Sequence, residues 1–347
     1  MNRSRLDYRY RAARNRAGSS LLLRALVRQG VTKMVIEYLP FEQRRPDSQY
    51  HDLLRQIIEE GDEVETRQGA LARRVIGPVM RFDLANGFPV ITERDLVTSS
   101  ETNMRPSQFH QALGEICAFI NGAQTQEELE YFGCFWWKEW VTTEKCAKRG
   151  LPTGNLGPGS YGAAFRRFPT AESESFDQIT YLLDQMRKFP GLRTHVISPW
   201  IPQYLSRGGE RNPRAVVAPC HGWVFVDLNP RTRELTLTHV QRSADVPVGL
   251  AFNLLHYAAL TLMLSKVLNY RAKELVFFIH NAHIYTEGPG RESQLPAVER
   301  MLATEPGRFP TVTLEPHVEN IFDFRPHHFL VTDYYPRLPR MRIWTPV

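Results

Sequence analysis

The chain has 347 residues, 42% of them hydrophobic, so it can bury the core of one large domain or of two ordinary ones. No uninterrupted run of about 18 apolar residues suggests a membrane span, and Leu21–Leu23 is too short, and too soon followed by arginine, for a secretory signal. The four cysteines are unevenly spaced and fit neither a disulfide framework nor a CxxC metal site. We therefore expect a cytoplasmic protein without a bound metal.

The formal net charge of +6 is unevenly distributed along the chain. Residues 1–45 hold eleven Arg or Lys and three acidic residues, which gives +8 and leaves −2 for the remainder. We expect a basic N-terminal extension over residues 1–46 and one main domain over 47–347. The extension either binds nucleic acid or another polyanion, or is a poorly ordered or dimer-packing arm.

After Pro46 the sequence becomes regular. Apolar spacing predicts a helix over 51–60, and residues 75–91 indicate two strands around the turn signal Asn86-Gly87. A helix over 108–120 follows, with Cys117 on its apolar stripe and Glu115 off it. A Gly/Pro-rich loop (154–162) and a helix near 176–188 come next.

The second half contains most of the predicted strands. A turn over 229–234 joins two of them as a hairpin, and a long apolar helix over 252–268 precedes the final strand. These elements predict a single large α+β domain with a mixed β-sheet and flanking helices. The predicted strands cover 193–198, 215–217, 223–228, 235–240 and 275–279.

Cys220 lies in "APCHGW" (218–223), at the edge of an apolar run. It is either a small core residue or a reactive thiol. "QRSAD" (241–245) directly follows a predicted strand, where Arg242 and Ser243 offer donors for an anion. If Arg242 also lies near Cys220, it favours the nucleophilic thiolate.

Two further motifs carry polar side chains at the ends of predicted elements. Asn253 lies on the first turn of the apolar helix, where it either caps the helix or pairs with the N3–H and O4 of a uracil ring. His283 and Tyr285 in "NAHIY" (281–285) are two residues apart and so share one face of a strand. They can hold a sugar hydroxyl, although a lone histidine there is commonly a core residue.

Three motifs, "APCHGW" (218–223), "QRSADVPVGLAFN" (241–253) and "NAHIY" (281–285), in this order and near these separations, resemble folate-dependent thymidylate synthase. Weaker similarities lie upstream in "ETRQG" around Arg67, in "GEICAFINGAQT" (114–125) and in "WWKEW" (136–140). "GNLGPGSYG" (154–162) and "IFDFRPHHF" (321–329) also match family segments. The resemblance covers about residues 48–347 and implies the thymidylate synthase-like fold.

The resemblance implies a reaction and a set of roles. A Cys220 thiolate would add to C6 of a uridylate, and C5 would take a one-carbon unit from the co-substrate 5,10-methylenetetrahydrofolate to give the 5-methyl nucleotide. The family also implies a homodimer in which Arg193 reaches the phosphate from the second subunit. The implied catalytic residues are Cys220, Glu115, Arg242 and Asn253; the substrate-binding residues are Arg67, Arg193, Gln241, Ser243, Asn253, His283, Tyr285 and Tyr161; the cofactor-binding residues are Asp245, Trp137, Trp140, Gly249 and Val347.

The chain departs from the family pattern at several positions. Thr194 stands where the family has a second arginine, and His256 replaces the usual serine beside the base pocket. The last residues, Trp344 to Val347, correspond to a tail that closes over the folate in the family. This sequence lacks the last two residues of that tail. These departures keep a second function open, that of a pyrimidine nucleotide 5-hydroxymethylase. Either function is compatible with a specialised nucleoside pathway. A third reading is a weakly active relative that binds RNA through its basic arm.

Overall fold

The computed structural model describes residues 36–99, 106–206 and 213–346. Most of the basic extension predicted over 1–46 therefore lies outside the described residues. Residues 36–46 are part of the main body, because Ile36 and Arg44 are buried there. The Arg44 guanidinium donates hydrogen bonds to the backbone oxygen of Phe309 (3.0 Å) and to Thr311 Oγ1 (2.7 Å).

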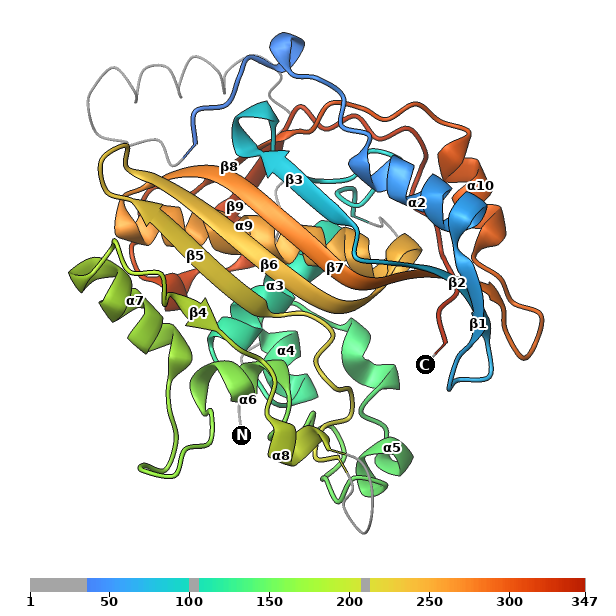
Figure 1. Cartoon of the computed structure of the whole chain (residues 1–347), viewed down its shortest axis with the longest axis horizontal. Coiled ribbons are helices and arrows are strands. Elements are labelled where there is room, and N and C mark those ends of the chain that lie inside the picture. Colours follow the sequence, from blue (N-terminus) through green and yellow to red (C-terminus); the bar gives the residue numbers. More distant parts are fainter. Residues whose placement is uncertain (1–35, 100–105, 207–212, 347) are drawn as a thin grey trace, which may run out of the picture. The chain divides into compact units, whose positions relative to one another are not determined.

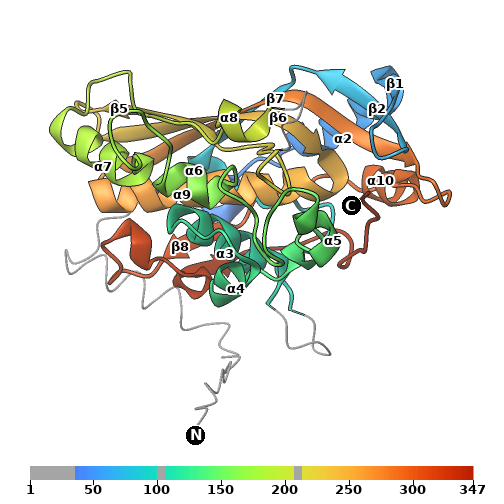
Figure 2. The same cartoon turned by 90° about the horizontal axis from the view of Figure 1, so that it is seen from below.

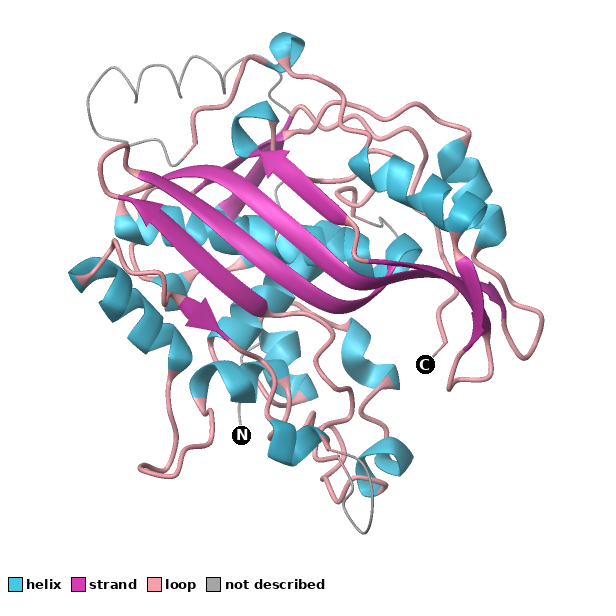
Figure 3. Cartoon of the chain, in the orientation of Figure 1, coloured by secondary structure: helices cyan, strands magenta, loops and turns pink. Residues whose placement is uncertain are grey.

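A mixed sheet of seven strands is the centre of the fold (Figure 1; strands magenta in Figure 3). Its strands run in the order β1-β2-β7-β6-β5-β4, with β3 pairing with β7 beyond the end of β2. Strands β6 and β7 are parallel, and the other described pairs are antiparallel. A small second sheet joins β8 to β9. The strands are β1 (Asp62–Glu65), β2 (Leu71–Ile76), β3 (Val79–Asp83), β4 (Val196–Ile197), β5 (Trp223–Asn229), β6 (Glu234–Asp245), β7 (Arg271–Glu287), β8 (Thr311–Leu314) and β9 (Phe329–Thr332).

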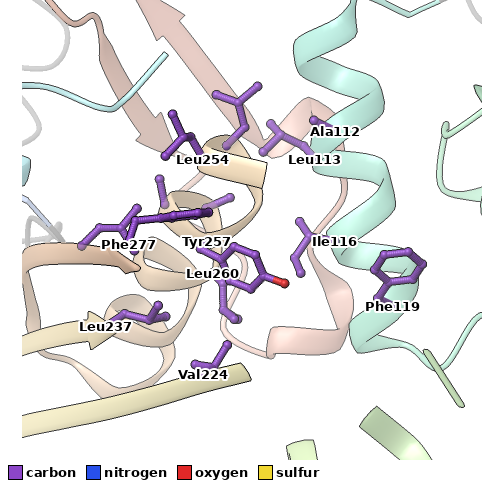
Figure 4. Packing of buried hydrophobic residues seen from close by; sticks show 14 of the residues in the cluster. Ala112, Leu113, Ile116, Phe119, Val224, Leu237, Leu254, Tyr257, Leu260 and Phe277 are labelled. Carbon is purple, nitrogen blue, oxygen red and sulfur yellow. The ribbon is translucent and has the colours of Figure 1, made fainter. Parts of the chain in front are cut away.

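The helices gather on one side of the sheet, with α9 directly against it and α3 beyond α9 (Figure 2). Both helices are apolar on nearly every side, because each lies between other elements. Figure 4 shows Ile116 of α3 facing Tyr257 of α9, with Phe277 of β7 on the sheet side. The helices are α2 (Gln49–Glu60), α3 (Gln108–Ile120), α4 (Gln126–Tyr131), α5 (Thr143–Ala147), α6 (Tyr161–Arg166), α7 (Gln178–Lys188), α8 (Pro202–Leu205), α9 (Ala251–Leu268) and α10 (Leu295–Leu302).

A single turn of π-helix, Val246–Leu250, leads directly into α9. Among the described residues, the combined segment Val246–Leu268 is the one helix long and apolar enough to cross a membrane by length and composition. However, 89% of its apolar window is buried inside the fold. We therefore interpret it as the core helix of the domain.

The strand predictions need correction where polar residues extend a strand. The strand predicted over 235–240 continues to Asp245, so the QRSAD motif lies within β6 and not after it. The strand predicted over 275–279 likewise spans Arg271–Glu287. Because residues of QRSAD pair with Ile279 to His283 of β7, ladder hydrogen bonds and not an apolar pattern hold these ends in place.

Three further strand predictions were wrong in part or whole. The strand predicted over 193–198 is limited to Val196–Ile197. Residues 215–217 form no strand, since Val216 donates its backbone N–H to Leu156 in the Gly/Pro-rich loop and is buried there. Over 75–91, the break falls at Gly77-Pro78, and Asn86 ends a short 3₁₀ helix that is not a hairpin turn.

Gly114 on α3 lies where the loop at Phe132 approaches the helix closely. A Cβ added there would lie 2.3 Å from the backbone oxygen of Phe132, a distance no real Cβ adopts. We expect Gly114→Ala to lower the free energy of unfolding by about 1–3 kcal/mol, because backbone must move to make room. Chemical denaturation measures this, with Gly191→Ala as the matched control, since nothing lies within 4 Å of that added Cβ. Equal stability of the two variants would contradict the described packing.

Candidate active site

Cys220 lies in the loop that enters β5 and is half-buried, whereas Cys117, Cys134 and Cys146 are buried. Its backbone carbonyl accepts from the N–H of Arg242 at 2.8 Å, which fastens the loop to β6. Its own N–H donates to the hydroxyl of Tyr161 at 2.8 Å. The backbone around the thiol is therefore fixed from two sides.

The guanidinium of Arg242 lies beside the thiol, with Nη2 3.3 Å from Cys220 Sγ. Arg242 also donates to the backbone oxygens of Pro219 and Ala218, at 3.2 and 3.3 Å. Burial raises the pKa of the Cys220 thiol, and the positive charge of Arg242 acts against that rise. The expected proximity of thiol and guanidinium is thus present, while burial keeps the thiol harder to ionise than a free cysteine.

Glu115 projects from α3 and is buried despite its charge. Its Oε1 accepts from the indole N–H of Trp136 at 2.9 Å and from that of Trp137. Its Oε2 lies 2.9 Å from His256 Nε2, close enough for an ion pair but without the alignment of a hydrogen bond. Charge-assisted hydrogen bonds of this kind hold a buried carboxylate in one orientation.

Asn253 lies on the first turn of α9 but does not cap it. Its Oδ1 accepts from Gln241 Nε2 at 2.8 Å, and its Nδ2 lies 3.4 Å from His256 Nδ1. Gln241 Nε2 also donates to the backbone oxygen of Ser243 at 3.0 Å. Gly249 lies beside this carboxamide, because a Cβ there would be 3.9 Å from Asn253 Oδ1.

The parallel pairing of β6 with β7 brings two motifs together. Ser243 is opposite Asn281 and Asp245 is opposite His283. The rings of His283 and Tyr285 have centroids 5.0 Å apart, as their position on one face predicts. Burial lowers the pKa of His283 to about 4, so the imidazole is neutral near neutral pH.

Asp245 ends β6 and is held by the C-terminal segment of the chain. Its carboxylate accepts from Gln294 Nε2 (3.0 and 3.1 Å) and from Thr345 Oγ1 (2.8 Å). Burial raises its pKa to about 6, and these hydrogen bonds oppose that rise. A hollow of about 460 Å³ is lined by residues 342–345 of the same segment.

Several of the predicted site residues lie elsewhere. Arg67, in the turn between β1 and β2, and Arg193, before β4, are both exposed to solvent. Trp140 is half-buried under the ammonium group of Lys145, 5.3 Å from its ring centroid. Trp137 points its indole N–H at Glu115, and the half-exposed Trp136 stacks on Phe252 with centroids 4.8 Å apart. Val347 lies outside the described residues.

Sequence reasoning missed the contacts of His256, Trp136, Gln294 and Thr345. His256 was visible as a departure from the family pattern, but its contact with Glu115 depends on how α9 crosses α3. The motif resemblance named Trp137 and Trp140, and it did not show that the adjacent indoles of Trp136 and Trp137 both donate to Glu115.

A half-buried thiol beside a fixed guanidinium is an arrangement that suits a cysteine nucleophile, and the same domain holds a buried carboxylate at Glu115 and a restrained carboxamide at Asn253. Among protein-family models, the chain matches the one described as thymidylate synthase over residues 48–343. The chain therefore belongs to the thymidylate synthase family, which confirms the resemblance and the α+β fold class. The family comprises one-carbon transferases that use methylenetetrahydrofolate as co-substrate and act on dUMP-like nucleotides.

The contact of Arg242 with Cys220 predicts how the thiol titrates. In Arg242→Gln, the opposing positive charge is lost, so the pKa of the Cys220 thiol rises. We expect the pH midpoint of Cys220 alkylation by iodoacetamide to move upward, followed by mass spectrometry of the modified peptide. The three buried cysteines serve as internal controls that react slowly in both proteins. An unchanged midpoint would show that Arg242 does not act on the thiol.

Proposed function

We propose that the protein transfers a one-carbon unit from 5,10-methylenetetrahydrofolate to C5 of a uridylate through a covalent adduct at C6. The observation that supports this best is the 3.3 Å contact between Cys220 Sγ and Arg242 Nη2. A thiolate is the form of cysteine that attacks carbon, and a nearby cation favours it. The family membership supports the one-carbon transfer, and the site residues support its direction toward a pyrimidine.

In this proposal Cys220 Sγ forms a bond to C6 of the pyrimidine, and electron density moves from the C5–C6 double bond to C5 and O4. Stabilising charge that develops during reaction is commonly the largest catalytic contribution. The Nδ2 of Asn253 is suited to donate to O4, while its Oδ1 is suited to accept from N3–H. Glu115 assists proton movement at the base from its place on α3.

The sugar and phosphate are assigned to residues of several elements. Arg242 and Ser243 on β6 would bind the phosphate, Arg67 would reach it from the exposed turn between β1 and β2, and Arg193 would reach it from a second subunit. His283 and Tyr285 hold the ribose hydroxyl, with the neutral imidazole serving as donor or acceptor. Tyr161 holds the backbone N–H of Cys220.

The residues at the end of β6 fit a folate. Asp245 is an acceptor at the edge of the site, the stacked Trp136 and Phe252 offer an aromatic surface, and a hollow lies along residues 342–345. When bound, methylenetetrahydrofolate supplies the one-carbon unit and, for a methyl product, the hydride. Asp245 would hold the pterin ring, and Thr345 must release the carboxylate for this.

A second candidate product is the 5-hydroxymethyl nucleotide, in which water completes the reaction. The observation in its favour is His256, a departure from the family pattern that lies 2.9 Å from Glu115 and changes the surroundings of that carboxylate. General-base activation of water requires a proton acceptor within reach, which Glu115 would supply. Identification of the product separates the two candidates.

The central prediction concerns the product and the thiol. Incubation with dUMP, UMP, dCMP or CMP plus methylenetetrahydrofolate is expected to give a 5-methyl uridylate and dihydrofolate, identified by mass spectrometry and absorbance. Cys220→Ala is expected to lower turnover by about four orders of magnitude or more while nucleotide still binds. Cys146→Ala, a buried thiol on α5, serves as the control that keeps its activity. A hydroxymethyl product would select the second candidate, and an active Cys220→Ala variant would refute the adduct.

We also propose that two copies of the chain associate through the face of the sheet opposite α9. Paired residues from four strands place an apolar row there: Trp223, Val240, Phe278 and Val79. Val79 is 53% exposed, and Phe225 beside this row is 43% exposed. A contiguous apolar face of this kind marks an interaction surface.

Substitution of Val240→Asp and Phe278→Asp together is expected to give a monomer in analytical ultracentrifugation, because two charges would be buried at the interface. The control, Tyr131→Asp, changes a 73% exposed side chain on α4 away from this face. A dimer that persists in the double variant would place the interface elsewhere.

A further inference from the structure

A continuous line of polar side chains runs through the core between β6 and α3. It starts at the backbone oxygen of Ser243, passes through Gln241, Asn253 and His256, and ends at Glu115. Each of the four side chains is buried. Buried polar groups need partners of the correct type, so the order of donors and acceptors along this line is constrained.

The orientation of the line is set at its β6 end. The Ser243 carbonyl is only an acceptor, so the side-chain atom of Gln241 that faces it must be the NH₂ group. The same Nε2 faces Asn253, and therefore meets Oδ1 of that carboxamide. Asn253 Nδ2, which is only a donor, is left to face His256.

The other end of the line is constrained independently. The two indole N–H groups of Trp136 and Trp137 are donors only, so Glu115 Oε1 is an acceptor. His256 Nδ1 must accept from Asn253, which places the proton of a neutral imidazole on Nε2, the nitrogen that lies 2.9 Å from Glu115 Oε2. The Asn253 contact thus sets the tautomer of His256, and it turns the N–H of that ring toward the side of the Glu115 carboxylate.

We propose that His256 is a positioning residue that, together with Gln241, holds the carboxamide of Asn253 in one orientation by linking it to Glu115. This inference rests on the proposed function, since it assigns base selection to Asn253. Uracil presents a donor at N3 and an acceptor at position 4, whereas cytosine presents the reverse, so the two bases need opposite orientations of the carboxamide. Locking that orientation makes the site selective between the two bases.

The tautomer is measured directly in the full-length protein. Long-range ¹H–¹⁵N correlation spectra of histidine-labelled protein, assigned with His256→Gln, are expected to show His256 protonated on Nε2 and not on Nδ1. A proton on Nδ1 would place two donors face to face and would overturn the inference. This measurement requires no nucleotide and no turnover.

The effect on base selection is measured as the ratio of dissociation constants for dUMP and dCMP, by calorimetry. His256→Leu removes both contacts and leaves the carboxamide restrained by the hydrogen bond from Gln241, so we expect the ratio to narrow by about ten-fold or more. His256→Gln supplies an acceptor and a donor at similar reach and is expected to keep the ratio within about three-fold of the unaltered protein. A purely structural role for the histidine would not separate these two variants.

The matched control is His195→Leu. His195 is also buried, and both of its ring nitrogens are without a hydrogen-bond partner, so its replacement removes no side-chain hydrogen bond. We expect it to keep the selectivity ratio. If His256→Leu keeps it as well, the inference is wrong while the proposed function stands. If the unaltered protein binds neither nucleotide, the proposed function fails. The NMR measurement of the tautomer then tests by itself whether His256 accepts from Asn253.

Discussion

The parallel pairing of β6 with β7 is the constraint on which the site depends. It places Ser243 beside Asn281 and Asp245 beside His283. A parallel pair requires a crossover connection, and here that connection contains α9, which brings Asn253 and His256 back to the same strand ends. A shift of β6 by one residue in this register would send the side chains of Ser243 and Asp245 to the other face of the sheet. The position of Cys220 also depends on β6, because its backbone carbonyl accepts a hydrogen bond from the N–H of Arg242.

Burial acts on three ionisable groups of the site in the same direction, toward the uncharged form. It raises the pKa of the Cys220 thiol and of Asp245, and it lowers the pKa of His283. Arg242 is held beside these groups by two backbone carbonyls. Because few charges compete with it, a guanidinium in such surroundings interacts more strongly with an anion than it would in water.

The parts of the fold that follow from apolar periodicity were predictable from sequence. Helices α3 and α9 and the burial of Cys117 were expected, since their residues contact core on several sides. The strand ends that carry the site were not, because Arg242 and His283 interrupt the apolar pattern while the backbone continues its ladder.

The candidate site residues came mainly from motif resemblance, and their contacts came from the fold. Sequence brought Cys220 and Arg242 into one hypothesis, and the structure places them in contact. It did not show that the indole N–H groups of both Trp136 and Trp137 donate to Glu115. The polar line through His256 requires side chains from β6 and α9 and from α3, which is far from both in sequence, so no local pattern encodes it.

The hydrogen bond between Thr345 and Asp245 has a consequence for any ligand that seeks this carboxylate. The Thr345 hydroxyl belongs to the same chain and is therefore present at a high effective concentration, so a donor group of the ligand must compete with it for the Asp245 carboxylate. Measured affinity then reflects the difference between two bound states and not the strength of the new contact alone. Weakening the internal donor would therefore tighten ligand binding without adding a single contact to the ligand.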